Sequence, residues 1–274
     1  MAQTGSQPFQ DPFSFRLIES VVSERFVRLP LKIVVLLVSA LLARAADELP
    51  RGRVLERVTC AQAPAQAYAI FLPPNYDPAR KWPLLLCLDP GANGRRAVER
   101  FAAAAERLGW IVAGSLNSRN GPWDANAVAI NAMVKDVAAC LAVDPRRIYA
   151  AGLSGGACVA CQLAMMNKLI QGVIERSAGF PGSDVPGKVA FPVFGTAGLE
   201  DFNHNELRRL EAALDERRTP HRIVIFNGGH EWLPAPLAQE ELAFNDAARL
   251  ANEPAFEKLR EDPKFHELAA APKP

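Results

Sequence analysis

Apolar residues in the middle of the chain form short runs that alternate with longer amphipathic stretches. One of these runs, residues 83–88, is apolar throughout, as expected for a strand that is buried on both faces of a sheet. The longer stretches between the runs have the spacing of helices. This alternation predicts an α/β fold, with a mostly parallel sheet and helices on both faces.

The expected elements lie within one domain that spans residues 47–250. The strands are expected at 54–60, 67–72, 83–88, 110–115, 147–151, 172–176, 191–194 and 222–226, and the helices at 97–108, 127–141, 156–168, 204–217 and 236–250. Asp144-Pro145 is expected to end the second helix before the strand at 147–151. In such a sheet the carboxyl ends of the parallel strands share one edge, where we expect the functional site.

Composition narrows the function classes. The 274 residues are 49% hydrophobic and 22% charged, which suits a globular domain with a sizeable core. Lys and Arg total 31 against 30 Asp and Glu, and no extended basic cluster occurs. We therefore expect no nucleic-acid partner.

The amino end has the pattern of a secretory signal peptide. Residues 1–45 form a leader, and within 25–45 basic residues precede the apolar run 33–42, which is too short to span a bilayer comfortably. Ala43-Arg44-Ala45 then supplies a cleavage site of the A-x-A type. The segment predicts a secreted or periplasmic protein, or a cytoplasmic one if the leader is not functional.

The carboxyl-terminal tail, residues 251–274, contains a near-repeat, EPAFEKL followed by DPKFHEL. Each copy can begin a short helix with an acidic cap and a proline in the first turn. Two such helices bury little by themselves, so we expect this tail to dock on the domain or to contact a protein partner.

The five cysteines give no metal-binding pattern. Cys158 and Cys161 form a C-x-x-C, but they lie in an Ala-rich helical run where cysteine acts as a small apolar residue. We interpret them as core residues rather than a redox pair, and we expect no metal.

The sequence GLSGG at 152–156 lies between an expected strand and an expected helix. A G-x-S-x-G in this context predicts a tight turn that exposes the Ser154 hydroxyl, with glycines where side chains would collide. The N–H of Gly155, at the helix start, is suited to stabilise an oxyanion. Ser154 is therefore the candidate nucleophile.

A serine nucleophile needs a histidine base, and this fold places the carboxylate and then the histidine after the serine. His221 opens a strand, His204 starts a helix and His266 lies in the tail, whereas His230 follows the last strand in FNGGHEW. His230 is the candidate base by elimination.

The orienting carboxylate is expected on the turn after the strand at 191–194. Asp201 is the candidate, with Glu200 as the alternative. The second half of the oxyanion hole is expected in the loop LDPGANG, where Pro90 has no N–H; Gly91 is the candidate donor and Ala92 the alternative.

These motifs, GLSGG, GLED and GGHEW, together with SRNGPW at 118–123, resemble the α/β-hydrolase family, and most closely bacterial esterases related to polyhydroxybutyrate depolymerases and feruloyl esterases. The resemblance covers roughly residues 50–250. It implies hydrolysis of small or polymeric carboxylic esters by a Ser-His-Asp triad through an acyl-enzyme, without metal or organic cofactor. Many relatives carry His-Gly where this chain has Asp89-Pro90.

Two further expectations follow from the resemblance. The short stretch between Ser154 and Asp201 leaves little or no room for a lid domain, which predicts an open site. Trp123 and Trp232 could line this site, and each could equally be a core or rim residue. Two alternatives remain. A serine peptidase of related fold is one, because a triad also cleaves amides, and a non-catalytic binding protein is the other, because a fold can be retained without catalytic activity.

Overall fold

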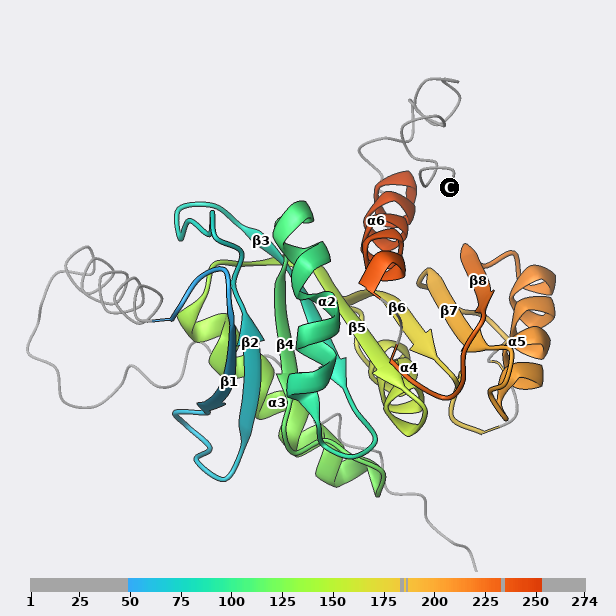
Figure 1. The fold of residues 1–274 in the computed structure, drawn as a ribbon, viewed down its shortest axis with the longest axis horizontal. Coiled ribbons are helices and arrows are strands. Elements are labelled where there is room, and N and C mark those ends of the chain that lie inside the picture. The colour runs from blue at the N-terminus through green and yellow to red at the C-terminus, as the bar shows by residue number, and fades with distance from the viewer. Residues whose placement is uncertain (1–48, 183–184, 186, 233–234, 253–274) are drawn as a thin grey trace, which may run out of the picture. The chain divides into compact units, whose positions relative to one another are not determined.

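The computed structural model describes residues 49–252, except 183, 184, 186, 233 and 234. The expected leader and most of the expected tail lie outside this part. Within it, eight strands form one sheet in the order β1-β2-β4-β3-β5-β6-β7-β8 (Figure 1).

The strands are β1 (Val54–Thr59), β2 (Ala67–Phe71), β3 (Trp82–Leu88), β4 (Ile111–Ser115), β5 (Val143–Leu153), β6 (Ile170–Arg176), β7 (Val193–Gly198) and β8 (His221–Phe226). The helices are α2 (Gly94–Leu108), α3 (Trp123–Cys140), α4 (Gly155–Met166), α5 (His204–Glu216) and α6 (Ala235–Asn252). No helix of the described ranges has both the length and the apolar character needed to cross a membrane.

The sheet is parallel from β4 through β8 and antiparallel at its other end. β1 pairs antiparallel with β2, and β2 pairs antiparallel with β4, while every other neighbouring pair runs parallel. The expected mostly parallel sheet is therefore confirmed. The carboxyl ends of β3, β5, β6, β7 and β8 consequently lie along one edge.

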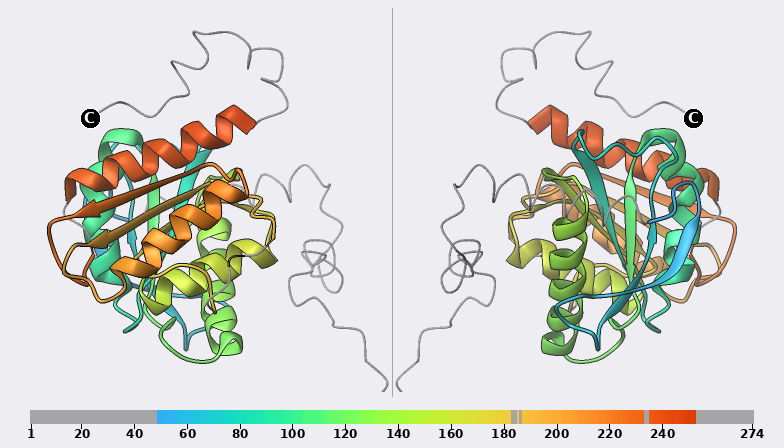
Figure 2. Two further views of the ribbon diagram at one scale, coloured as in Figure 1. Left: turned by 90° about the vertical axis from the view of Figure 1, so that its right-hand side faces the viewer. Right: turned by 90° about the vertical axis from the view of Figure 1, so that its left-hand side faces the viewer.

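Helices cover both faces of the sheet, as Figure 2 shows. Helices α2 and α6 pack against each other on one face, and α3, α4 and α5 lie on the other. The main apolar cluster fills the space beneath α2 and α6 and includes the buried rings of Phe101, Trp110, Tyr149, Phe194 and Trp232. Burial of these large apolar surfaces is the main force that holds the layers together.

Several element boundaries differ from the sequence-based expectation, and three of them show how neighbouring residues shift a boundary. Helix α2 begins at Gly94 because the Asn93 side chain accepts the N–H of Arg96 at 3.2 Å and caps the helix earlier. Helix α3 begins at Trp123, directly after Pro122, which closes the preceding loop. Strand β5 includes Asp144-Pro145, which were expected to separate a helix from the strand.

The proline is tolerated in β5 because the pairing is irregular there. Trp82 is opposite Val143, whereas Leu84 is opposite Ile148, so the residues between them on β5 have no regular partners on β3. Pro145 is exposed in this segment.

A carboxyl group is buried beneath α4. Glu175 on β6 is fully buried, and its Oε1 accepts the S–H of Cys161 on α4 at 2.6 Å. Burial raises the pKa of Glu175 from 4.5 to about 8, against the lowering effect of the Cys161 hydrogen bond. The folded protein therefore keeps a proton on Glu175 that the unfolded chain releases near pH 4.5.

This raised pKa makes stability depend on pH. The contribution of Glu175 is fully present below pH 4.5 and is lost as the pH rises toward 8. The variant Glu175→Gln keeps the shape without the ionisation, so at pH 9 we expect it to be more stable than the native chain by roughly 2–4 kcal/mol. Urea unfolding of both proteins at pH 5 and pH 9, under reducing conditions, measures the difference. The assignment would be contradicted if the free energy of unfolding of Glu175→Gln fell between pH 5 and pH 9 by as much as that of the native chain.

Candidate active site

Ser154 occupies the sharp turn between β5 and α4. Its backbone has φ 53° and ψ −124°, a conformation that costs a non-glycine residue free energy. The turn is held because the N–H of Ser154 donates to the carbonyl of Arg176 at 2.7 Å. The side chain does not cap the helix, and no described residue forms a hydrogen bond with its Oγ, so the hydroxyl is left for another partner.

The glycines around Ser154 are required by close backbone approaches. A Cβ on Gly152 would lie 2.1 Å from the carbonyl oxygen of Gly156, and a Cβ on Gly156 would lie 2.1 Å from that of Leu88. Both distances are far below van der Waals contact, so any side chain would separate the helix from the strands. The expectation that side chains would collide at these positions is confirmed.

Gly155 begins α4, so its N–H has no acceptor within the helix. It lies directly after Ser154 and at the positive end of the helix dipole, where negative charge is stabilised. The position suits the proposed donor to an oxyanion.

His230 and Asp201 form a hydrogen-bonded pair. His230 Nδ1 lies 3.0 Å from Asp201 Oδ1, and the carboxylate side chain is fully buried while the imidazole is 25% exposed. The same oxygen accepts the backbone N–H of Asn203 at 2.8 Å. With Nδ1–H donated to Asp201, Nε2 is the ring nitrogen left to accept a proton.

The charge on Asp201 is stabilised by its surroundings. Burial favours the neutral form, but the nearby Ser177 hydroxyl, the hydrogen bond with His230 and the N–H of Asn203 outweigh it, and the pKa of Asp201 is lowered from 3.8. Among the described residues, neither the Ser177 Oγ nor Asp201 Oδ2 forms a hydrogen bond of good geometry, so this hydroxyl acts as a nearby dipole. Asp201 is therefore ionised at neutral pH.

Two backbone contacts join the loop of Asp201 to the loop of His230. The N–H of Leu199 donates to Phe226 O at 2.8 Å, and that of Glu200 donates to Gly228 O at 3.0 Å. A Cβ on Gly198 would lie 2.1 Å from the Gly228 oxygen, so the loops can approach this closely only at glycine. These contacts hold the two loops together and so fix the position of His230 relative to Asp201.

The three predicted residues share the carboxyl edge of the parallel sheet. Ser154 follows β5, Asp201 follows β7, and His230 follows β8. The strand β6 lies between β5 and β7, and the N–H of Ser177 at its end donates to Thr196 O at 2.8 Å. The sequence order and the strand order together bring the candidate nucleophile to the same edge as the His–Asp pair.

The alternatives for the base and the carboxylate lie elsewhere. His204 begins α5 and His221 begins β8, as expected, and His221 Nδ1 contacts the carbonyl of Thr219 at 2.8 Å. Glu200 is exposed, whereas Asp201 contacts His230. His266 lies outside the described residues.

In the loop expected to complete the oxyanion hole, the candidate N–H donors already form hydrogen bonds within the loop. Gly91 N–H donates to Asp89 Oδ1 at 2.8 Å, and Ala92 N–H donates to the Asp89 carbonyl at 3.1 Å. Asp89 Oδ2 accepts the indole N–H of Trp232 at 2.7 Å. Neither Gly91 nor Ala92 has a free N–H in this arrangement. The Gly91 bond depends on the Asp89 side chain, whereas the Ala92 bond is made to the backbone of the turn.

Of the two alternatives left open for Trp232, a wall of the site or a core position, the structure shows the core, because this residue is only 1% exposed. Its ring lies against the buried Arg176 guanidinium, with the cation 5.4 Å from the ring centroid. Arg176 in turn pairs with the buried Glu241 at 2.5 Å. The indole thus anchors the His230 loop to the interior.

The sequence-based reasoning missed an apolar surface beside the pair. Phe202 is 77% exposed, and its ring stacks on the His230 imidazole with centroids 4.3 Å apart. Leu199, in the same turn, is 59% exposed. Large apolar residues flanking an expected triad acid are the signal that could have identified this surface.

The two cysteines of the C-x-x-C are both free thiols, and burial raises the pKa of each. A raised pKa keeps the thiols protonated and unreactive at neutral pH. The interpretation as core residues is confirmed for Cys161, which is buried, whereas Cys158 is partly exposed. Among the described residues, no three His, Cys, Asp or Glu side chains cluster so as to hold a metal ion.

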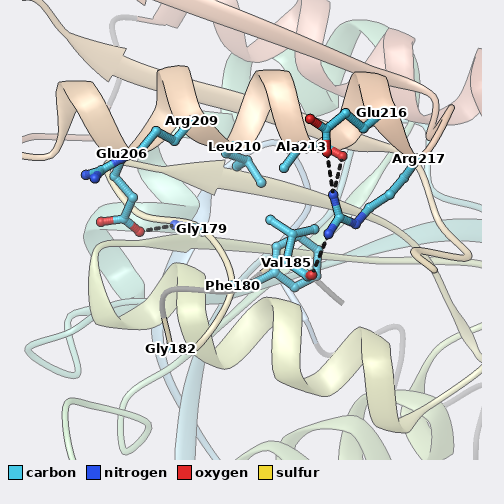
Figure 3. A pocket seen from close by; sticks show the side chains of 10 residues that line it. All are labelled: Gly179, Phe180, Gly182, Val185, Glu206, Arg209, Leu210, Ala213, Glu216 and Arg217. Atoms are coloured by element: carbon cyan, nitrogen blue, oxygen red, sulfur yellow. Dashed lines mark hydrogen bonds and ion pairs between the residues drawn. The ribbon is translucent and has the colours of Figure 1, made fainter. Parts of the chain in front are cut away.

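A cavity of about 580 Å³ lies beside α5 (Figure 3). It is lined by residues that include Phe180, Leu210 and Arg217. Its polar groups already bind one another: Glu206 accepts the N–H of Gly179 at 3.0 Å, and Arg217 donates to the Val185 carbonyl at 3.0 Å. Neither Ser154, Asp201 nor His230 lines this cavity.

Comparison with known proteins identifies the fold. No family model and no curated protein matches the chain. Solved structures similar to it include the hyperthermophilic esterase of the archaeon Pyrobaculum calidifontis, with a TM-score of 0.56 and 15% identity over 77% of this chain and 92% of the other. A ferulic acid esterase has a TM-score of 0.56 and 17% identity over 71% and 97%. An esterase of Mycobacterium marinum has a TM-score of 0.56 and 17% identity over 79% and 87%.

The sheet order, the two helix layers and these similarities show that the chain has the α/β-hydrolase fold. The three similar structures named above are esterases, in line with the motif resemblance. At these identities the similarity concerns the fold, and the chemistry has to be argued from the site.

Proposed function

We propose that the protein is a serine hydrolase that cleaves carboxylic esters. The observation that carries the proposal is the His230–Asp201 pair, held at 3.0 Å on the same sheet edge as the strained Ser154 turn. A buried ionised carboxylate, an oriented imidazole and a hydroxyl without a partner are the components of acyl transfer by a serine.

The chemistry proceeds in two halves. His230 Nε2 accepts the Ser154 proton as Oγ forms a bond to the ester carbonyl carbon, which gives a tetrahedral oxyanion. The oxyanion collapses, the bond to the alkoxy oxygen breaks, and His230 returns the proton to the departing alcohol. Water then repeats the sequence, with His230 taking its proton, and releases the acid while Ser154 regains its hydrogen.

Asp201 and the Gly155 N–H stabilise the charges that form. The carboxylate holds the imidazole in the tautomer with a free Nε2 and stabilises the imidazolium that follows. Gly155 N–H donates to the oxyanion at the amino end of α4. Gly91 and Ala92 can contribute a second donor only by giving up their hydrogen bonds to Asp89.

The surroundings favour an ester whose acyl or alcohol group is apolar and large. Within the described residues, the connection from β6 to β7 contains no helix that could act as a lid. Leu199 and Phe202 present apolar surface beside His230, on which an aryl or alkyl group can lie. Bulky small-molecule esters and the ends of ester polymers fit this arrangement.

The direct test is hydrolysis of p-nitrophenyl acetate, butyrate and octanoate by the purified protein. We expect turnover that increases from acetate to butyrate, together with a stoichiometric fluorophosphonate adduct that peptide mapping places on Ser154. A folded protein that neither hydrolyses these esters nor reacts with the probe would contradict the proposal and favour a binding role. Faster cleavage of matched peptide amides than of esters would instead favour a peptidase.

A further inference from the structure

The loop that follows β4 places the Asn120 side chain against the candidate oxyanion hole. A Cβ built on Gly155 would lie 1.8 Å from Asn120 Oδ1, 2.9 Å from its Cγ and 3.5 Å from its Nδ2. The carboxamide therefore fills the space in front of Gly155, the residue whose N–H faces the reacting group. Asn120 is exposed, and no described residue forms a hydrogen bond with its carboxamide.

The position of Asn120 is determined by its backbone. Its N–H donates to the Pro90 carbonyl at 2.8 Å, and the neighbouring Arg119 forms a β-bridge with Gly91. Arg119 N–H also donates to Asn126 Oδ1, 2.9 Å away on α3. The loop is thus fixed between α3 and the LDPGANG loop, so the carboxamide is delivered to Gly155 by a rigid support.

An oxyanion hole normally has two or more donors, and here only one is identified. Gly155 supplies an N–H, but the N–H groups of Gly91 and Ala92 are hydrogen-bonded to Asp89. A side-chain amide can donate to an oxyanion as well as a backbone N–H can. Asn120 Nδ2 has no hydrogen-bond partner among the described residues. The carboxamide oxygen is the atom nearest Gly155, and a half-turn about the Cβ–Cγ bond exchanges it with Nδ2, the donor.

We propose that Asn120 is a catalytic residue whose Nδ2–H supplies the second hydrogen bond to the tetrahedral oxyanion, beside the Gly155 N–H. This assignment rests on the proposed serine hydrolase function. It explains why Asp89 can bind Gly91 and Ala92 without disabling the site, since the donor has moved from the backbone of one loop to a side chain of the adjoining loop.

The main variant is Asn120→Ala, assayed with p-nitrophenyl butyrate. A donor used mainly in the transition state should lower kcat by about 10²–10³-fold and change KM by less than about threefold. The inhibition constant of a trifluoromethyl ketone, which forms a tetrahedral adduct with the serine, should rise by a similar factor. If Asn120 only supported the loop, its replacement would not change kcat and the inhibition constant by similar factors.

A matched control is Asn117→Ala in the same loop. Asn117 Oδ1 accepts the N–H of Ala67 at 2.8 Å, so its amide supports the loop rather than the site. We expect this variant to lose thermal stability and to keep kcat/KM within about threefold. An equal loss of kcat in both asparagine variants, with unchanged inhibitor affinity, would overturn the proposal.

A double-mutant cycle tests the contact itself. Gly155→Ala drives a Cβ into the carboxamide, so it should lower kcat by displacing Asn120, and the losses should not add in the variant that carries both Asn120→Ala and Gly155→Ala. Fully additive losses would contradict the assignment.

Failure of the proposed serine hydrolase function can be distinguished from failure of the Asn120 assignment, because the native chain would then show neither turnover nor labelling of Ser154. A native chain that is active and labelled, beside an Asn120→Ala variant of undiminished kcat, would remove Asn120 alone.

Discussion

Replacing Ser154 by alanine should lower kcat for p-nitrophenyl butyrate by about 10⁶-fold and abolish labelling by a fluorophosphonate. The loss is expected to be this large because Oγ is the atom proposed to form the acyl-enzyme. The neighbouring Ser177, which follows β6 at the same edge with φ 57°, is only 1% exposed and is not placed to replace it. The measurement is steady-state hydrolysis together with intact-protein mass spectrometry after exposure to the probe.

The folded state of this variant should be unaffected, because Ser154 Oγ has no hydrogen bond to lose. The companion variant Ser154→Gly should be equally inactive yet more stable by about 1 kcal/mol, since glycine adopts φ 53° without strain. Urea unfolding measures both. Residual turnover above about 1% of the native rate in either variant would contradict the role of Ser154 as the nucleophile.

Replacing Asp201 by asparagine should lower kcat by about 10⁴-fold while leaving the fold intact. Asp201 Oδ1 faces both the N–H of Asn203 and Nδ1 of His230, so an amide oxygen at this position keeps both contacts but lacks the negative charge that stabilises the imidazolium. An amide N–H₂ at this position gives up the Asn203 contact and favours the tautomer whose Nε2 carries the proton. An imidazole in that tautomer cannot accept the proton of Ser154. Single-turnover measurement of acylation reports this step directly.

The matched control is Glu200→Gln, which removes a carboxylate one position earlier in the same turn. Glu200 is exposed and does not contact His230, so kcat should stay within about threefold of the native value. A larger loss in Glu200→Gln than in Asp201→Asn would reverse the assignment.

Because the pKa of Asp201 is lowered from 3.8, its carboxylate stays ionised above about pH 5. A fall in native activity near pH 6 would therefore come from the titration of another group.

The element order of this protein could be predicted from its sequence with few errors. Continuous apolar runs such as residues 83–88 become fully buried strands, because such a run is stable only when both faces are covered. The errors concern boundaries that depend on contacts between elements. Pro145 lies inside β5 because the neighbouring β3 pairs irregularly there, and local sequence does not report the register of a neighbouring strand.

The candidate site was predictable where its chemistry depends on chain order. The strand–turn–helix around Ser154 and the loops after β7 and β8 each carry a local pattern, and parallel strands bring their carboxyl ends to one edge. The place of Trp232 stayed open because an aromatic residue next to a candidate base can face either the site or the core, and only packing against Arg176 and Asp89 decides between them.

By itself, the sequence determined the succession of strands and helices, the glycine-flanked turn of Ser154 and the order of nucleophile, acid and base, because these features depend on local periodicity and on parallel strand direction. Only the tertiary structure decided that Asp201 rather than Glu200 binds His230, that Asp89 occupies the N–H groups of Gly91 and Ala92, and that Asn120 lies against Gly155. The physical reason is that hydrogen bonds between loops far apart in the chain depend on ångström-scale distances. Those distances follow from the packing of the whole sheet and not from any local pattern of residues.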